Sequence, residues 1–453
     1  MAKLPSKTLF TGTIDNLDVI HMVDVSDTTA DPLGTSFKLT MAQVKTYVGV
    51  ASFDKVAIFA ASGTPTFYNT FALAYAASSV GDSIHVFADL TEDITIDKNL
   101  TVVGYGNTIT GEFFITSGAF VTMDVLNLTL ADAVNPTLAV DSSCTAILNG
   151  STVTNTLGVS IQLVGSVVKG TSYGTINVTA AGLLQDHKAY TDNETLATIT
   201  SLGALVNVYA KSTGGSLSNS NYAAINCTGG TCINSIGESE FGVGVILEND
   251  AILSKSSGIV FGVGSYGIYQ LTGSTGKVID CYASTAGVGF TIVAEYVYNS
   301  NAVSETGGGL LIGVEADNCT GHALLYGLGA SNSGGEVTIS NSTAITTDGA
   351  ASRVSDSTHA IFTNCTLRAL NLTGISSHGV LVVDSASVLT INNCTIITLS
   401  TLATSEGVDA GQFGTSVYAT NNAFSTAGGV RYNINVSLQE NRTQNAQGNR
   451  EIL

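Results

Sequence analysis

Five glutamates have the residue type and spacing suited to acid–base chemistry. Glu295, Glu315 and Glu336 recur at similar intervals, and Glu238 and Glu240 form a second group. Cleavage of a glycosidic bond needs two carboxylates, and a close pair raises the pKa of one of them so that it can donate a proton. The same residues also suit a solvated acidic face or a divalent cation such as Ca²⁺ held between neighbouring segments. We favour these latter interpretations, because no compact catalytic motif accompanies the carboxylates.

The sequence does not contain the motifs that a metal site or a polysaccharide lyase would need. The six His are scattered, none pairs with an acid at metal-ligand spacing, and the seven Cys include no CxxC pair. A polysaccharide lyase would need Ca²⁺ ligands and a basic residue that abstracts a proton, and no such motif is visible. Apart from the divalent cation that the glutamates could hold, the sequence therefore predicts no metal site and no bound cofactor.

The composition indicates many tight turns between short strands. The chain has 453 residues with 49 Gly, 4 Pro and no Trp, and only 11% of its residues are charged. Its net charge of -19 argues against nucleic-acid and anionic-membrane partners, which need Lys and Arg. No long apolar run predicts membrane insertion or a secretory signal. We therefore expect synthesis in a reducing cytoplasm, with free thiols.

An acidic or amide residue followed by a small residue recurs along the second half of the chain. The pairs are Asp280–Cys281, Asn299–Ser300, Asn318–Cys319, Asn341–Ser342, Asn364–Cys365 and Asn393–Cys394. The residue three positions before each Cys or Ser is apolar. Repeats of about 20–30 residues with short β segments are typical of a solenoid. Asn tolerates the left-handed backbone of a corner and can bond to stacked neighbours. The Cys residues then fill the corner as small core residues, not as metal ligands or nucleophiles.

The segment from Thr64 to Gly111 predicts how this solenoid begins. Residues 67–77 have helical apolar spacing, Gly81-Asp82 forms a turn, and the strands IHVF, DITI and LTVVGYG follow. This order resembles the opening of pectate-lyase-like right-handed parallel β-helices, in which a helix covers the open end of the first coil. The resemblance implies an all-β fold, and it does not transfer an activity.

The first 50 residues have a different pattern. Two strand-like segments, LDVIHMVDVSD and SFKLT, precede a helical turn that begins near Thr40. This segment resembles the N-terminal segments of bacteriophage tail fibres, tailspikes and related virion appendages. The residues that carry the resemblance include Asp24, Ser26, Asp27, Leu39, Gln43, Val44 and Tyr47. It implies attachment to other virion proteins through residues 1–50, a homotrimer, and a body that contacts a host glycan or receptor.

We therefore expect four regions: an adapter at 1–50, a linker and capping helix at 51–82, a parallel β-helix at 83–430, and a strand and polar tail at 431–453. The expected function is that of a structural virion appendage of a bacteriophage. A polysaccharide depolymerase on the same scaffold is the enzymatic alternative. A head fibre or other capsid appendage, and a bacterial adhesin, are further alternatives.

Overall fold

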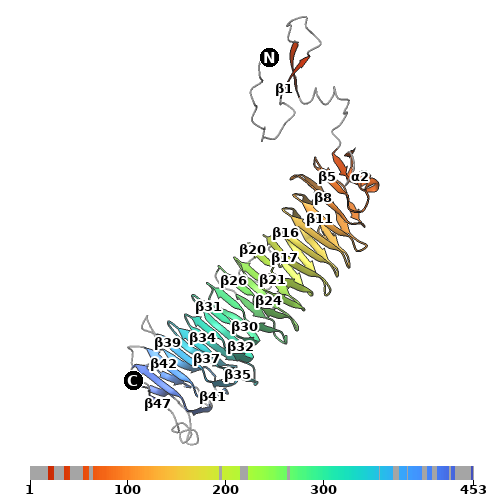
Figure 1. Cartoon of the computed structure of the whole chain (residues 1–453). Helices are drawn as coiled ribbons and strands as arrows, with labels where there is room; N and C mark the ends of the chain where they lie inside the picture. The colour runs from red at the N-terminus through yellow and green to blue at the C-terminus, as the bar shows by residue number, and fades with distance from the viewer. Residues whose placement is uncertain are drawn as a thin grey trace.

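The computed structural model of the chain is an elongated stack of short β-strands with a single short helix among its described residues (Figure 1). The structure describes residues 19–24, 35–40, 55–60, 65–192, 196–214, 223–262, 266–356, 358–370, 377–384, 386–399, 406–410, 416–427, 430–433 and 450–451. From β5 onward each coil pairs in parallel with the coils before and after it. The predicted parallel β-helix is therefore confirmed.

The strands line three faces of the β-helix, numbered here in their order along one coil. Face 1 contains β5 (Ser83–Val86), β8 (Leu100–Val103), β11 (Phe120–Asp124), β14 (Thr145–Asn149), β19 (Ala204–Val206), β22 (Thr231–Ile233), β25 (Ile252–Ser254), β28 (Lys277–Ile279), β35 (Glu336–Ser340), β38 (His359–Thr363), β41 (Val388–Asn392) and β44 (Ser416–Thr420).

Face 2 contains β6 (Leu90–Thr91), β9 (Thr108–Thr110), β12 (Asn127–Leu130), β20 (Tyr209–Ser212), β23 (Ile236–Ser239), β26 (Ser257–Val260), β29 (Tyr282–Thr285), β31 (Asn301–Ser304), β33 (Thr320–Ala323), β36 (Thr343–Thr346), β39 (Thr366–Leu370), β42 (Thr395–Leu399), β45 (Ala423–Ala427) and β47 (Arg450–Glu451).

Face 3 contains β7 (Ile94–Ile96), β10 (Phe113–Ile115), β13 (Leu138–Val140), β18 (Ile199–Ser201), β21 (Ala223–Cys227), β24 (Val243–Leu247), β27 (Ile268–Gln270), β34 (Tyr326–Ser331), β37 (Ala350–Ser355), β40 (His378–Val382), β43 (Glu406–Asp409) and β46 (Val430–Asn433). Five longer strands continue from one face to the next: β15 (Thr152–Leu163), β16 (Val167–Val178), β17 (Leu183–Thr191), β30 (Phe290–Tyr298) and β32 (Gly308–Asp317).

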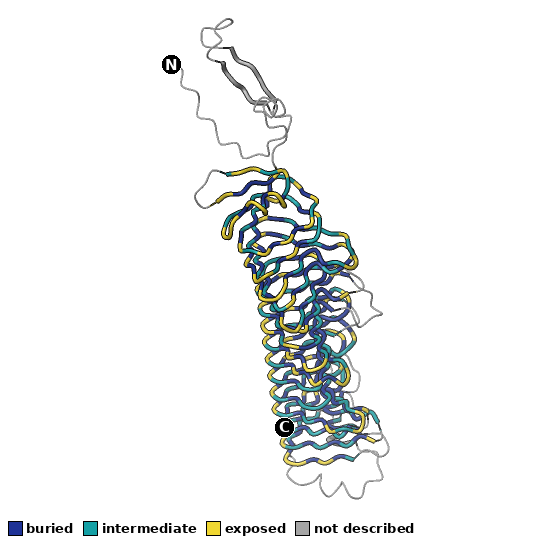
Figure 2. The backbone as a smooth tube through the Cα atoms, turned by 90° about the vertical axis from the view of Figure 1, so that its right-hand side faces the viewer, coloured by how far each residue is buried: buried dark blue, intermediate teal, exposed yellow. Residues whose placement is uncertain are grey.

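Apolar side chains alternate into the interior on every face, so one continuous core runs along the axis (Figure 2). The apolar column predicted before the corner residues lies in this core. Its members Ala316, Ile339, Phe362 and Ile391 pair in register on successive coils and are fully buried.

A helix covers the first coil, and it is shorter than predicted. The sequence indicates a helix over 67–77, whereas α2 spans Phe71–Ala77 and Thr66–Tyr68 forms strand β4. The Thr70 side chain accepts a hydrogen bond from the N–H of Leu73, and the Glu92 carboxylate accepts those of Phe71 and Ala72. These acceptors fix the helix start at Phe71. Antiparallel β3 (Val56–Phe59), which pairs with both β4 and β5, completes this end.

The repeated acidic or amide residues occupy the corner between faces 1 and 2. All six adopt left-handed backbone angles, with φ between 49° at Asn299 and 56° at Asn364. Side-chain amides bond from coil to coil: Asn318 to Asn299 at 2.9 Å, Asn364 to Asn341 at 3.2 Å and Asn393 to Asn364 at 2.7 Å. The column extends beyond the predicted residues to Asp186, Asn207, Asn234 and Asn421, which share the same backbone conformation. We call this column the corner ladder.

The Cys or Ser after each of the six predicted members of the corner ladder is buried and bridges two coils. Its side chain accepts the N–H of the equivalent residue one coil earlier, as Ser342 does from Cys319 at 3.0 Å and Cys394 from Cys365 at 3.3 Å. Burial raises the pKa of the Cys281 and Cys319 thiols to about 11, which keeps both protonated. These thiols therefore replace serine hydroxyls at a crowded corner.

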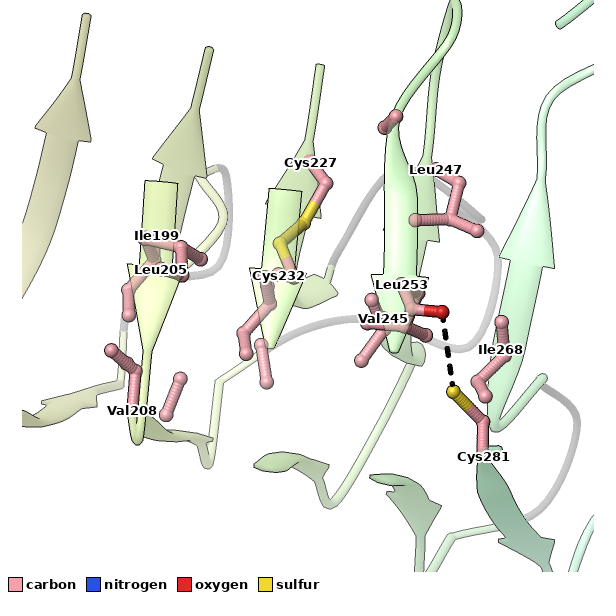
Figure 3. Close-up of a cluster of buried hydrophobic side chains, with 14 of the residues drawn as sticks. Ile199, Leu205, Val208, Cys227, Cys232, Val245, Leu247, Leu253, Ile268 and Cys281 are labelled. Atoms are coloured by element: carbon pink, nitrogen blue, oxygen red, sulfur yellow. Dashed lines mark hydrogen bonds between the residues drawn. A yellow bond between two sulfur atoms is a disulfide. The ribbon is translucent and has the colours of Figure 1, made fainter. Parts of the chain in front are cut away.

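The expectation of free thiols is wrong for one pair. Cys227, at the end of β21, and Cys232 in β22 form a disulfide across the turn between faces 3 and 1 (Figure 3). Cys144, Cys281, Cys319, Cys365 and Cys394 are free and buried. This pair could not be predicted, because the separation of the two residues matches no familiar cysteine motif.

The front segment contains a β-hairpin. β1 (Val19–Asp24) pairs antiparallel with β2 (Thr35–Thr40), with Asp24 opposite Thr35 and Leu39 opposite Ile20. Ser26, Asp27, Gln43, Val44 and Tyr47 lie outside the described residues. The adapter at 1–50 and the other three region boundaries stay predictions. In the part of the chain that the structure describes, no helix has the length and hydropathy needed to span a bilayer.

Candidate functional site

An open groove lies at the outer surface where β15, β16, β17 and β20 pass one another. Its volume is about 980 Å³, and it is lined by Thr152, Thr154, Asn155, Thr156, Gly158, Tyr173, Gly174, Thr175, Tyr190, Thr191, Asp192, Lys211 and Thr213. Hydroxyl groups, two aromatic rings, one carboxylate and one ammonium group therefore share one concave surface. Such a surface offers both hydrogen bonds and flat apolar faces to a ligand.

The buried side chain of Asn155 shapes this groove. Its Oδ1 accepts the N–H groups of Leu157 and Gly158 at 3.0 and 2.9 Å, and its Nδ2 donates to the carbonyl groups of Asn135 and Val159. The register between β15 and β16 shifts between Thr154 and Val159, where the chain turns outward. The fully hydrogen-bonded side chain of Asn155 thus stabilises a bend that interrupts the regular coil.

A column of five paired residues lies on face 2, and its first four members line the groove. In register it reads Thr154, Tyr173, Tyr190, Lys211 and Glu238, one residue from each successive coil. At about 4.8 Å between strands, these five side chains extend over roughly 19 Å. The Tyr173 and Tyr190 rings stack with centroids 5.5 Å apart and planes inclined by 25°. We call these five residues the groove column.

Tyr209 connects the groove column to a carboxylate. Its ring lies 5.8 Å from that of Tyr190, and its hydroxyl donates to Oε2 of Glu238 at 2.6 Å. Burial, followed by the hydrogen bond to Glu238, raises the pKa of Tyr209, so the phenol stays protonated. Glu238 is thereby fixed in orientation at the end of the column.

A second, smaller hollow of about 430 Å³ adjoins the groove. Lys211 lines both hollows, and the second is completed by Glu240, Phe241, Phe261 and Gly262. The Phe261 side chain is 58% exposed. Polar and aromatic groups therefore continue along the rod beyond the groove column.

The structure places the predicted glutamates at different locations. Glu238 lies in β23, in register with Lys211, and Glu240 directly follows the end of that strand and lines the second hollow. Glu315 lies on face 1, opposite Tyr296 in register, and accepts the Tyr298 hydroxyl at 3.0 Å. This environment, chiefly burial and then the Glu315 hydrogen bond, raises the pKa of Tyr298 to about 12.

The other two glutamates are not in register with Glu315. Glu295 lies at a register shift just before the paired segment of β30, and Glu336 begins β35, two residues before the partner of Glu315. The Glu336 carboxylate lies 3.4 Å from Nδ1 of His359, and both side chains are well exposed. Glu295, Glu315 and Glu336 are thus staggered over neighbouring coils and do not form one column.

Sequence reasoning missed the aromatic part of the site. Tyr173, Tyr190 and Lys211 occupy outward positions of face 2, but their spacing follows no fixed period because the coils here differ in length. The available signal was the sequence alternation in YTDN and VYAKS, which places an aromatic or basic residue on the outward side of neighbouring strands.

The sequence matches no protein-family profile and no curated protein. Among solved structures, the periplasmic alginate epimerase AlgG shares 8% identity with a TM-score of 0.27, over 82% of this chain and 86% of that chain. The Dettilon tailspike protein shares 11% identity with a TM-score of 0.24, over 78% of this chain and 62% of that chain. At these scores neither likeness contributes to the assignment of fold or function; the chain is a parallel β-helix on its own strand register.

Proposed function

We propose that this chain is a virion appendage of a bacteriophage that binds a polysaccharide of the host surface along the groove of face 2. The observation that carries the proposal is the groove column, in which Tyr173 and Tyr190 lie between the Thr154 hydroxyl and the charges of Lys211 and Glu238. Aromatic rings suit the apolar face of a sugar, and the flanking polar groups suit its hydroxyls. The linear column suits a linear polymer.

The scaffold supports an appendage role through its stiffness. Each coil is hydrogen-bonded to two neighbours along the whole body, so bending the rod requires many bonds to distort together. The resemblance of residues 1–50 to virion-attachment segments supplies the anchoring end of the proposal. A homotrimer would place three grooves side by side and raise the avidity for a repetitive glycan.

Binding to immobilised polysaccharides tests the proposal. The full-length protein is applied to an array of purified bacterial capsular and O-antigen polysaccharides, together with Tyr190→Ala and the control Tyr418→Ala, whose exposed tyrosine lies on face 1. We expect wild-type and Tyr418→Ala to retain the same polysaccharide, and Tyr190→Ala to bind at least about tenfold more weakly, a loss of about 1.4 kcal/mol. Equal binding by all three proteins would exclude the groove.

The depolymerase alternative is favoured by one observation. Glu238 lies in β23 and Glu240 directly follows the end of that strand, so two carboxylates lie two residues apart beside the groove column, and glycosidic cleavage needs such a pair. Glu238→Gln and Glu240→Gln should then both abolish release of oligosaccharides from a bound polysaccharide, and retention should persist in Glu240→Gln, because Glu240 lies outside the groove column. Retention without release by the wild-type protein would leave adhesion as the function.

Assembly and location are tested separately. Light scattering of the purified chain, with and without residues 1–50, gives its native mass. A trimer in both cases would support a self-assembling body, a trimer lost on truncation would assign assembly to the front segment, and a monomer in both would refute a free-standing trimer. Gold-labelled antibodies on virions would distinguish a tail fibre from a head fibre or other capsid appendage.

A further inference from the structure

Three potential metal ligands converge on face 3 near the far end of the described coils. His378 begins β40, Glu406 begins the neighbouring strand β43, and Asp409 ends β43. Nδ1 of His378 lies 3.5 Å from Oε2 of Glu406 and 3.8 Å from Oδ2 of Asp409. The three ligand atoms all lie within 4.8 Å of one another. They come from two adjacent coils, because His378 and Glu406 pair in register.

A break in strand alternation allows Glu406 and Asp409 to cooperate. Residues three apart on a regular strand point to opposite faces. Here Gly407 and Val408 are both buried, so the residues on either side of them both face outward. Gly379 and Gly407 make this possible by close backbone contact: a Cβ on Gly379 would lie 2.4 Å from the Gly407 carbonyl oxygen. The backbone geometry is therefore adapted to bring the two carboxylates together.

The distances do not suit an ion pair with the imidazole. A charge-assisted hydrogen bond between an imidazolium and a carboxylate is about 2.7–2.9 Å long. Both separations are longer, and Nδ1 of His378 is buried with no hydrogen-bond partner among the described residues. Ligands held at about 2.1 Å around a tetrahedral metal ion are separated by about 3.4 Å. The separations of 3.5 and 3.8 Å are close to that value.

The surroundings favour a cation. The three side chains are only 14%, 13% and 20% exposed, so two carboxylates share a site largely withdrawn from water. A divalent ion bound there would be held by both carboxylates and by Nδ1 of His378.

We propose that His378, Glu406 and Asp409 bind a divalent transition-metal ion that links two adjacent coils of the β-helix. One imidazole and two carboxylates suit Zn²⁺ or Co²⁺, with water completing the coordination. Ca²⁺ is a poor fit, because it requires six to eight oxygen ligands. The ion would link β40 to β43 and stabilise that end of the rod. This inference does not depend on the proposed function.

Titration of the untagged, EDTA-treated full-length protein with ZnCl₂ tests the site. We expect one Zn²⁺ per chain by calorimetry, a Tm that rises with Zn²⁺, and loss of both effects in His378→Asn and Glu406→Gln. His359→Asn is the matched control, because His359 also lies beside a glutamate on the β-helix but has no third potential ligand among the residues that the structure describes. It should bind Zn²⁺ as the wild type does.

Co²⁺ gives an independent readout. A four-coordinate protein site produces intense visible absorption, whereas Co²⁺ held loosely with its water shell absorbs weakly. Intense absorption that His378→Asn abolishes would support the site even if that variant is less stable. Three results would overturn the proposal: wild-type binding no stronger than that of His378→Asn, equal binding of Ca²⁺, or a Tm that responds to pH near the histidine pKa and not to metal.

Discussion

Replacing Ser342 with alanine should expose one backbone amide, that of Cys319, to exchange with solvent. The Ser342 hydroxyl is 1% exposed, accepts this N–H at 3.0 Å, and donates to the carbonyl of Ser340 at 2.6 Å. Alanine leaves the N–H buried without an acceptor, which costs about 1–3 kcal/mol. At 1.36 kcal/mol per factor of ten, protection of the Cys319 amide should fall about 5- to 150-fold.

Hydrogen exchange measured by mass spectrometry on peptides covering residues 314–324 gives this number, and peptides from residues 90–115 serve as the internal reference. Ser342→Cys is the matched control, because Cys394 accepts the N–H of Cys365 at the same position of a later coil. It should change exchange by less than about tenfold, since a volume-similar swap costs at most about 1.5 kcal/mol. Unchanged exchange in Ser342→Ala, or equal acceleration in both variants, would refute hydrogen bonding as the reason for small polar corner residues.

Two further predictions concern stability. Burial lowers the pKa of His187 to about 3. Below about pH 6.5 the unfolded chain therefore binds a proton at this residue and the folded chain does not. As the pH falls from about 6.5 to 3, the free energy of unfolding should decrease by about 1.4 kcal/mol per pH unit. His187→Gln should flatten this slope in urea titrations, and an unchanged slope would place the acid sensitivity elsewhere. Gly258→Ala should destabilise by at least about 1–3 kcal/mol, because its Cβ would lie 2.0 Å from the Gly267 carbonyl oxygen. Gly229→Ala, with no atom closer than 3.4 Å to its Cβ, is the control, and equal melting temperatures would contradict the close approach of the coils.

The regular coils were predictable because each one repeats the same short sequence pattern. An apolar residue, an Asn and a small residue recur together, and the structure stacks Ile339, Phe362 and Ile391 in register inside the core. The Asn residues indicate where the corners lie, because few other residues readily adopt the left-handed backbone angles of a corner. The start of the capping helix was not predictable, because it depends on Glu92, which a later turn brings to the amides of Phe71 and Ala72.

Neither candidate site could be derived from spacing alone. The groove column requires the register of β15, β16 and β17, and that register shifts near Thr154 and Val168. The cluster of His378, Glu406 and Asp409 requires two outward residues three apart in one strand, which regular alternation forbids. Both sites depend on irregular backbone, whereas sequence periodicity reports only regular backbone.

The groove lies at this position of the rod because the backbone is irregular there. A regular coil gives each outward side chain neighbours above and below and leaves little depth for a ligand. Depth arises where a strand bends away from the stack, and such a bend leaves backbone groups that need new partners. Asn155 supplies those partners with both ends of its amide. Replacing it would remove the hydrogen bonds that hold the bend, so the proposed binding of a polysaccharide to this face should depend on one buried amide.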